Sequence, residues 1–295
     1  MRVKHPPSPG ETVIGWEYAE PIDGGKGSNQ AIAAARLGAR VSFVGCLGKD
    51  RLGDQGEAWM RQAGVDTRFV RRSDSSTGVG FILLDERGVP AMVTCMGANA
   101  ELAPEEVYTA LDQLRGQILL TQFEIPTEVA LAAARQARRQ GMLTIINPAP
   151  APGEPLDGLE AADILVPNES EARQLLGLSE SEVMDDTSLA KRLRSQCGAG
   201  CVLVTLGERG VVGVDAEGVW SVTPPVVQAA DTSGAGDVFC AALAFGLTHG
   251  RHLRSASTWA CQTAALSVTR PGTIPGFPTL EEVQDFLASF PPEAQ

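Results

Sequence analysis

Residues 231–237 (DTSGAGD) join a glycine-rich turn to a carboxylate, directly before the apolar run 238–247. This pattern predicts a turn that opens a helix, where the first backbone amides have no internal partner and the helix dipole is positive. Gly234 and Gly236 carry no side chain, so a phosphate could approach these amides closely. Asp237 would lie beside the bound anion and could accept a hydroxyl proton, as phosphoryl transfer requires. The alternative is an ordinary helix start with an acidic first turn.

A second glycine-rich segment, residues 23–30 (DGGKGSNQ), leads into an alanine-rich stretch 31–37 that predicts a helix ended by Gly38. The segment is neither a Walker A motif nor a G-x-G-x-x-G turn after a strand, so neither nucleotide-binding fingerprint applies. It suits close approach of the backbone by a polar ligand. The alternative is a structural loop with Lys26 in solvent.

Composition limits the classes of protein to consider. The chain has 295 residues, 43% of them apolar, and a net charge of −12, which argues against a nucleic-acid-binding surface. An acidic protein with an anionic substrate needs local positive groups or a metal at its site. No apolar run is long enough for a membrane span, and no signal-peptide core is present. The six cysteines are scattered, and Cys197 and Cys201 have poor zinc spacing, so reduced thiols in the cytoplasm are expected.

From residue 104 onward, strands alternate with helices. Strands are expected at 117–121, 142–146, 163–166 and 202–204, and helices at 104–114, 127–140, 168–176, 235–248, 251–269 and 279–289. This alternation predicts a parallel sheet covered by helices on both faces, with ligands bound beyond the carboxyl ends of the strands. Polar residues that follow those strands are therefore site candidates: Glu124, Asn147, Asn168, Glu171, Thr205 and Gly207.

Two segments break the alternation. In residues 77–94, Val79, Phe81 and Leu83 alternate with other residues before a tight turn, which predicts a β-hairpin. Such hairpins form small subdomains or lids, and the alternation predicts one apolar face that needs cover. A second hairpin is expected from strands at 211–214 and 219–222.

Five segments together resemble the ribokinase-like (PfkB) carbohydrate kinase family, and within it the ribokinase branch: residues 24–30 (GGKGSNQ), 147–150 (NPAP), 168–171 (NESE), 205–207 (TLG) and 231–237. The resemblance extends from about residue 9 to 277. It implies one α/β domain over residues 1–295, built as a three-layer sandwich around a mostly parallel sheet. A small β-lid would be contributed by residues 12–20 and 77–95. In this family the lids of two subunits pair, which implies a homodimer.

The resemblance implies ATP-dependent phosphorylation of D-ribose at its 5-hydroxyl. Asp237 would be the base, and the amides of Gly234, Ala235 and Gly236 would form an anion hole for the phosphoryl group. Two alternatives stay open. One is a related kinase for deoxyribose, a nucleoside, pseudouridine or fructose, and the other is a sugar- or nucleotide-binding protein without turnover.

The resemblance also assigns the remaining site residues. Sugar contacts are implied at Gly25, Lys26, Gly27, Ser28, Asn29 and Glu124. ATP contacts are implied at Asn168, Thr205, Leu206, Gly207, Glu208, Arg209, Gly210, Gly236, Asp237 and Cys261, where Cys261 replaces a usual Asn or His. Glu171 would organise Mg²⁺ through water. A K⁺ site is implied at Asp231, Ser233, Ser267, Arg270, Gly272 and Gly276, where Gly276 replaces a frequent Ser.

The family begins with a strand that carries a sugar-binding Asp in a Gly-Ser-x-Asn-x-Asp segment, and this sequence starts after it. A truncated gene model or an alternative start is expected. Loss of a central strand would leave neighbouring strands without ladder partners, so we expect low stability and weak ribose binding. Comparison with a chain extended upstream tests this expectation, and an equal melting temperature with an equal KM for ribose would contradict it.

Overall fold

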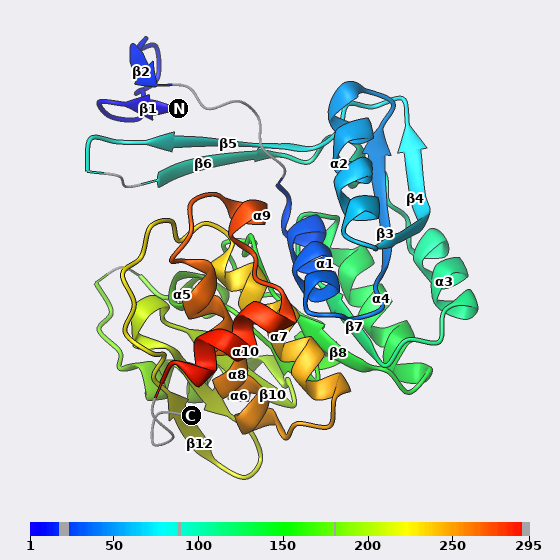
Figure 1. Cartoon of the computed structure of the whole chain (residues 1–295), viewed down its shortest axis with the longest axis vertical. Helices are drawn as coiled ribbons and strands as arrows, with labels where there is room; N and C mark the ends of the chain where they lie inside the picture. Colours follow the sequence, from blue (N-terminus) through cyan, green and yellow to red (C-terminus); the bar gives the residue numbers. More distant parts are fainter. Residues whose placement is uncertain (18–23, 88–89, 180, 291–295) are drawn as a thin grey trace.

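The computed structural model describes residues 1–17, 24–87, 90–179 and 181–290, and its body is a three-layer α/β sandwich (Figure 1). The middle layer is a six-stranded sheet in the order β12-β11-β10-β9-β8-β7. Strands β7 to β10 are parallel, and β11 and β12 complete the sheet as an antiparallel hairpin. Their bounds are β7 (Ile118–Thr121), β8 (Leu143–Ile146), β9 (Ile164–Leu165), β10 (Cys201–Thr205), β11 (Val211–Val214) and β12 (Val219–Val222). The predicted fold class is confirmed.

Helices cover both faces of this sheet because its strands are apolar on both sides. Ile146 and Leu165 pack on one face with α4 (Thr127–Arg139), α5 (Glu169–Leu175) and α6 (Asp186–Cys197). Ile145 and Ile164, one residue earlier in each strand, pack on the other face. That face is covered by α7 (Ala235–Thr248), α8 (Leu253–Ser267) and α10 (Leu280–Ala288).

A separate parallel pair, β3 (Ser42–Gly48) and β4 (Asp66–Ser73), lies beside the main sheet with α2 (Arg51–Gln62) and α3 (Pro104–Gln113). Among the described strands, β3 pairs only with β4, and β7 pairs only with β8. The sequence pattern did not reveal β4, because much of it is charged. Arg71 and Arg72 of β4 pair with glutamates of neighbouring elements instead of forming an apolar strand pattern.

The expected hairpin is present as β5 (Val79–Leu84) and β6 (Pro90–Cys95), which extend over the body as a lid (Figure 1). With β1 (Arg2–Val3) and β2 (Gly15–Glu17) they form a sheet in the order β2-β1-β5-β6. Residues 18–20 of the expected lid strand, Asp23 of the glycine-rich segment and residues 291–295 of the expected domain lie outside the described residues.

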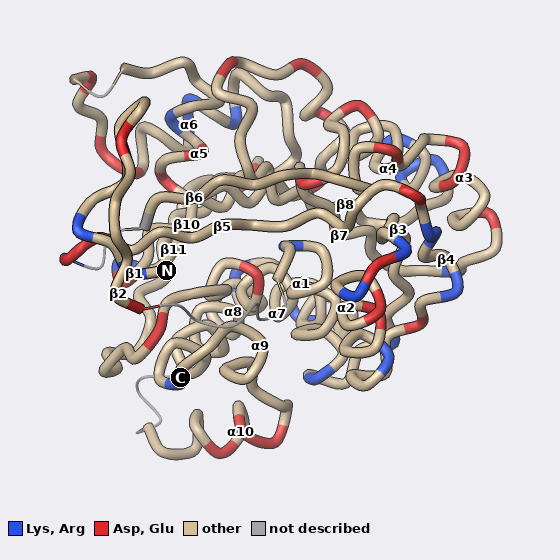
Figure 2. The backbone as a smooth tube through the Cα atoms, turned by 90° about the horizontal axis from the view of Figure 1, so that it is seen from above, with Lys and Arg blue, Asp and Glu red and all other residues tan. Residues whose placement is uncertain are grey.

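The lid differs from expectation in having exposed apolar side chains on both faces. Phe81 pairs with Val93, and the next pair, Ile82 with Met92, points to the opposite face. These four side chains are 51%, 59%, 43% and 66% exposed, respectively. Figure 2, which looks down on the lid, shows that β5 and β6 carry no charged residue. The lid is thus a thin apolar sheet that the body covers incompletely.

Helix α1 (Lys26–Arg36) begins five residues earlier than predicted, directly after Gly25. Gly25 has a φ of 88°, which glycine adopts without strain. Lys26 and Asn29 therefore project from the first turn of a helix rather than from a loop. At the other end, Arg36 donates hydrogen bonds to the backbone carbonyls of Ile274, within α9 (Thr273–Gly276), and of Phe277, directly after it.

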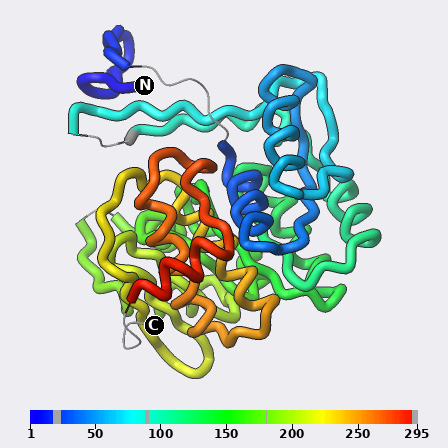
Figure 3. The backbone as a smooth tube through the Cα atoms, in the orientation of Figure 1, coloured from blue at the N-terminus to red at the C-terminus, as the bar shows by residue number. Residues whose placement is uncertain are grey.

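The N-terminus lies at the lid, whereas α10, the last described helix, lies in the body below it (Figure 3). All six cysteines are free, and four are buried, whereas Cys95 on the lid is exposed. Among the described residues, we find no helix with both the length and the apolar character that a membrane crossing needs.

Candidate active site

The two glycine-rich segments of the sequence meet at Asp237. This residue lies in the first turn of α7 and is only 6% exposed. The side-chain amide of Asn29 donates to its Oδ2 at 2.9 Å, and that of Gln30 donates to its Oδ1 at 3.0 Å. Although Asn29 and Asp237 are 208 residues apart in sequence, packing of α1 against α7 brings them into contact.

A glycine turn opens α7, as the sequence predicted, and Gly236 in its first turn is exposed. Gly234 has a φ of 76°, and a Cβ there would lie 2.7 Å from Thr273 Cγ2 and 2.9 Å from Phe277 Cε1. A Cβ on Gly236 would meet no protein atom within 4 Å. Because the first amides of a helix lack intrahelical acceptors, this exposed turn can bind an anion beside Asp237.

Three carboxylates act electrostatically on the ammonium group of Lys26. Burial alone would lower the pKa of Lys26, but Asp237, Glu171 and Glu124 outweigh it and raise that pKa above its usual value. Burial also raises the pKa values of Asp237, Glu124 and Glu171. Three carboxylates facing one lysine leave the site more negative than an anionic substrate would favour.

The predicted sugar residues gather at the start of α1. Glu124 accepts a hydrogen bond from the backbone amide of Lys26 at 2.7 Å, so it caps the helix. Ser28 donates to the backbone carbonyl of Gly24 at 2.6 Å. The Oδ1 atom of Asn29 is buried and has no hydrogen-bond partner among the described residues. An unpaired buried acceptor is costly, so a ligand hydroxyl is a fitting partner for it.

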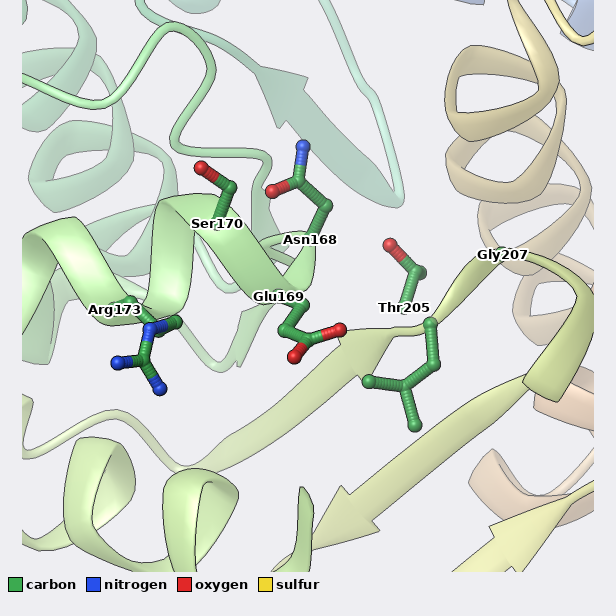
Figure 4. Close-up of a pocket in the computed structure, with 7 residues that line it drawn as sticks. Asn168, Glu169, Ser170, Arg173, Thr205 and Gly207 are labelled. Atoms are coloured by element: carbon green, nitrogen blue, oxygen red, sulfur yellow. The ribbon is translucent and has the colours of Figure 1, made fainter. Parts of the chain in front are cut away.

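A pocket of about 440 Å³ lies at the carboxyl ends of β9 and β10. Asn168 and Thr205, both predicted nucleotide residues, are joined there by a parallel bridge. Figure 4 shows the start of α5 beside Thr205, with side chains from both segments lining the pocket. Its full lining consists of Asn168, Glu169, Ser170, Arg173, Thr205, Leu206 and Gly207. The sequence analysis included Glu169 and Ser170 in the motif 168–171 but gave them no role, and it did not single out Arg173, because a polar residue on a short helix carries no distinguishing pattern.

The remaining predicted nucleotide residues are less closely grouped. Glu208, Arg209 and Gly210 follow the pocket, where Arg209 pairs with Glu169 at 2.5 Å and also with Asp186. Cys261 lies within α8, is 5% exposed and packs in the core, and burial raises the pKa of its thiol to about 12.

Asn168 and Glu171 form a capping box at the start of α5. Asn168 Oδ1 accepts from the Glu171 amide, and Glu171 accepts from the Asn168 amide, both at 2.8 Å. These two hydrogen bonds cap α5, and they hold the Glu171 carboxylate near Lys26 and Asp237, which interact with it electrostatically.

The residues predicted for K⁺ lie in two stretches of the chain, the turn before α7 and residues 267–276, from the end of α8 to the end of α9. A hydrogen bond from the Gly276 amide to the Gly272 carbonyl, at 3.2 Å, connects the contacts within the second stretch. Asp231 accepts hydrogen bonds from the backbone amides of Ser233 at 2.9 Å and Gly272 at 3.0 Å. A Cβ on Gly276 would lie 3.2 Å from the carbonyl oxygen of Ser267 and 3.6 Å from that of Arg270. The six residues thus form one oxygen-rich cluster.

Comparison with known proteins supports the chemistry that this geometry allows. The family model described as pfkB family carbohydrate kinase matches residues 17–280. A ribokinase of Haemophilus influenzae is 36% identical over 284 residues, covering 95% of this chain and 91% of that protein. A deoxyribokinase of Salmonella typhi is 32% identical over 269 residues, covering 90% of this chain and 87% of that protein.

Solved structures of ribokinases have a fold similar to that of this chain. The crystal structure of a Thermotoga maritima ribokinase has a TM-score of 0.85 at 34% identity, covering 98% of this chain and 95% of that one. An Arabidopsis thaliana ribokinase complexed with ribose and ATP has a TM-score of 0.84 at 27% identity, with the same coverage. Because the family model spans most of the chain, this protein belongs to the pfkB family of carbohydrate kinases.

Proposed function

We propose that the protein phosphorylates D-ribose at its 5-hydroxyl with ATP. The observation that carries this proposal is the buried Asp237 at the start of α7, which lies between an exposed glycine turn and the side chains of Lys26 and Asn29. The relative from Haemophilus influenzae is a ribokinase, and a solved neighbour contains ribose and ATP.

In this mechanism the sugar binds at the start of α1, with Lys26, Asn29 and Glu124 contacting its hydroxyls. Asp237 accepts the proton of the attacking hydroxyl, while the amides of Gly234, Ala235 and Gly236 stabilise charge on the transferring phosphoryl group. ATP occupies the pocket between Asn168 and Thr205, so that its terminal phosphate reaches the same turn. The lid closes over the sugar and excludes water, which limits ATP hydrolysis.

A coupled assay of ADP release tests the substrate directly. Ribose should give the highest kcat/KM in a panel that also contains 2-deoxyribose, fructose, pseudouridine and a nucleoside, and KCl should raise the rate relative to choline chloride. If 2-deoxyribose gave the highest kcat/KM, the chain would instead have the activity for which its Salmonella typhi relative, a deoxyribokinase, is named. Nucleotide binding without turnover of any sugar would contradict the proposal.

We propose Mg²⁺ as the metal that accompanies ATP. The Glu171 carboxylate fits this role, because a hydrogen bond from the Asn168 amide holds it close enough to Asp237 for electrostatic interaction, and Mg²⁺ prefers oxygen ligands. When bound, Mg²⁺ neutralises charge on the nucleotide phosphates. Glu171 would hold it through water.

Replacing Glu171 with glutamine should separate metal binding from helix capping. Glutamine can still accept the hydrogen bond from the Asn168 amide, so the melting temperature should stay within about 3 °C. The Mg²⁺ concentration for half-maximal rate should rise about tenfold, because a charge that favours the metal is lost. An unchanged Mg²⁺ dependence in a Glu171→Gln protein would leave only the capping role.

We propose the loop cluster around Asp231 as the K⁺ site. Its carboxylate is fixed by two backbone amides, and hydrogen bonds to Ser233 and Gly272 overcome the effect of burial and lower its pKa. An ionised Asp231, connected through Gly272 and Gly276 to the carbonyls of Ser267 and Arg270, fits a monovalent cation. This cation would stabilise the turn that precedes α7.

We propose that two copies pair through their lids. Phe81 and Val93 form an uncharged exposed patch of the kind that marks protein contacts. Val93→Glu should convert a dimer into a monomer, measured by size-exclusion chromatography with light scattering. Val226 is 96% exposed and lies outside the lid, so Val226→Glu is the matched control and should not change the mass. A monomeric wild-type chain would contradict this proposal.

We place the protein in the cytoplasm. The reaction draws on ATP, and all six cysteines are unpaired thiols, which suits a reducing compartment.

A further inference from the structure

The second amide on Asp237 comes from a residue that lies behind the site. Gln30 is 1% exposed, whereas the turn that precedes Asp237 reaches the surface. The Nε2 atom of Gln30 donates to Asp237 Oδ1 at 3.0 Å and to Asn147 Oδ1 at 3.2 Å. Its Oε1 accepts from Gln122 Nε2 at 2.5 Å. All polar atoms of this amide are therefore used within the protein.

The orientation of the Gln30 amide is set by its neighbours. Asn147 donates through Nδ2 to the backbone carbonyl of Val166 at 2.8 Å, so its Oδ1 faces Gln30 as an acceptor. Gln122 presents its Nε2 from the other side. Rotating the Gln30 side-chain amide by about 180° would bring its oxygen close to two other acceptors, Asn147 Oδ1 and the Asp237 carboxylate. It would also bring its nitrogen close to the Gln122 donor. The network thus permits one arrangement, with the donor toward Asp237.

This network connects the sheet to the proposed base. Gln122 follows β7, Asn147 follows β8 and Val166 follows β9, so the carboxyl ends of three neighbouring strands hold one glutamine. We propose that Gln30 is a positioning residue that fixes the Asp237 carboxylate for proton acceptance, with Gln122 and Asn147 fixing Gln30. The proposal rests on the proposed kinase function of this site.

Four charged or titratable groups act on Asp237: Lys26 on α1, Glu124 after β7, Glu171 on α5, and Cys240 on the same helix as Asp237. Replacing Gln30 removes none of them. A hydrogen bond from Gln30 favours the ionised carboxylate and lowers its pKa. Loss of this donor should therefore raise the Asp237 pKa, so that the acidic limb of the pH profile of kcat/KM moves to higher pH.

The test compares pH profiles of kcat/KM for ribose. Gln30→Met should shift the acidic limb upward by about one pH unit, the equivalent of a tenfold change in proton affinity. Gln30→Glu keeps the size of the side chain but adds a carboxylate, so it should shift the limb further. Gln122→Met leaves Gln30 in place but frees its amide to turn, and it should give a smaller shift. Gln140→Met, which removes an exposed amide that donates to Asp112, is the control and should leave the profile unchanged.

A purely structural role predicts another result. Gln30→Met would then lower the melting temperature or reduce the rate equally at every pH, with no displaced limb, and this would overturn the proposal. A wild-type chain that phosphorylates no sugar would instead refute the proposed function. In that case, carboxyl ¹³C NMR titration of Asp237, with the signal identified by its loss in Asp237→Asn, still measures the effect of Gln30 on this carboxylate. An identical titration in wild type and Gln30→Met would overturn the inference.

Discussion

Replacing Asp237 with asparagine is expected to lower kcat by about 10²- to 10⁴-fold, the range by which general bases accelerate reactions. Asparagine has nearly the same shape but cannot accept the hydroxyl proton. The glycine turn and the pocket at Thr205 are untouched, so ATP should bind with unchanged affinity. Single-turnover kinetics and calorimetric titration with ATP measure these two quantities. A variant that retains kcat would remove Asp237 from the base role.

The raised pKa of Asp237 gives this prediction a pH dependence. In the wild type, kcat/KM should fall on the acidic side at a higher pH than an ordinary aspartate, with a pKa near 3.9, would produce. The folded protein prefers the protonated carboxyl, so its contribution to stability is largest at low pH and is lost as pH rises through the raised pKa. The melting temperature of Asp237→Asn, relative to wild type, should therefore increase from acidic to neutral pH. A constant difference would show that the Asp237 pKa is not raised.

The second large effect is expected when either glycine before Asp237 is replaced with alanine. Gly234→Ala should mainly reduce stability, whereas Gly236→Ala should mainly reduce kcat. Gly234→Ala places a Cβ 2.7 Å from Thr273 Cγ2 at a positive φ, which destabilises the loop by at least about 1 to 2 kcal/mol. Gly236→Ala meets no protein atom, so its melting temperature should match that of wild type. Its Cβ would occupy the space of the phosphoryl group, and kcat should fall about 10²-fold or more.

Thermal melts and steady-state kinetics on the two alanine variants distinguish these mechanisms. Gly236→Ala with full kcat would show that no ligand approaches this turn closely. Loss of stability in Gly236→Ala, at a position open to solvent, would mean that the turn has a structural function instead.

Much of the fold could be predicted from sequence because its signals are local. The helix at 235–248 and the hairpin strands at 211–214 and 219–222 have the predicted bounds. Each combines an apolar run with a glycine or a turn at its end. The start of α1 was misplaced because its first turn, residues 26–30, is polar, and only the tertiary contacts to Asp237 and Glu124 explain that composition.

The features that sequence could not predict depend on contacts between distant segments. Gln30 was visible as part of a motif, but its role depends on Gln122, Asn147 and Asp237, which come from three other elements. The exposure of the lid on both faces depends on which other elements pack against β5 and β6, and no local pattern encodes that. The assignments of Lys26, Glu171 and the K⁺ cluster came from resemblance, and they stay predictions.

The separation of 208 residues between Asn29 and Asp237 also has a consequence during synthesis. At about 5 to 20 residues per second, the ribosome needs about 10 to 40 s to make the chain between them. During this interval the alanine-rich face of α1 cannot pack on α7, its principal partner in the native protein. The nascent chain therefore carries this alanine-rich segment without its native partner for most of its translation. Transiently exposed apolar surface of this kind makes a chain prone to aggregate before it is complete.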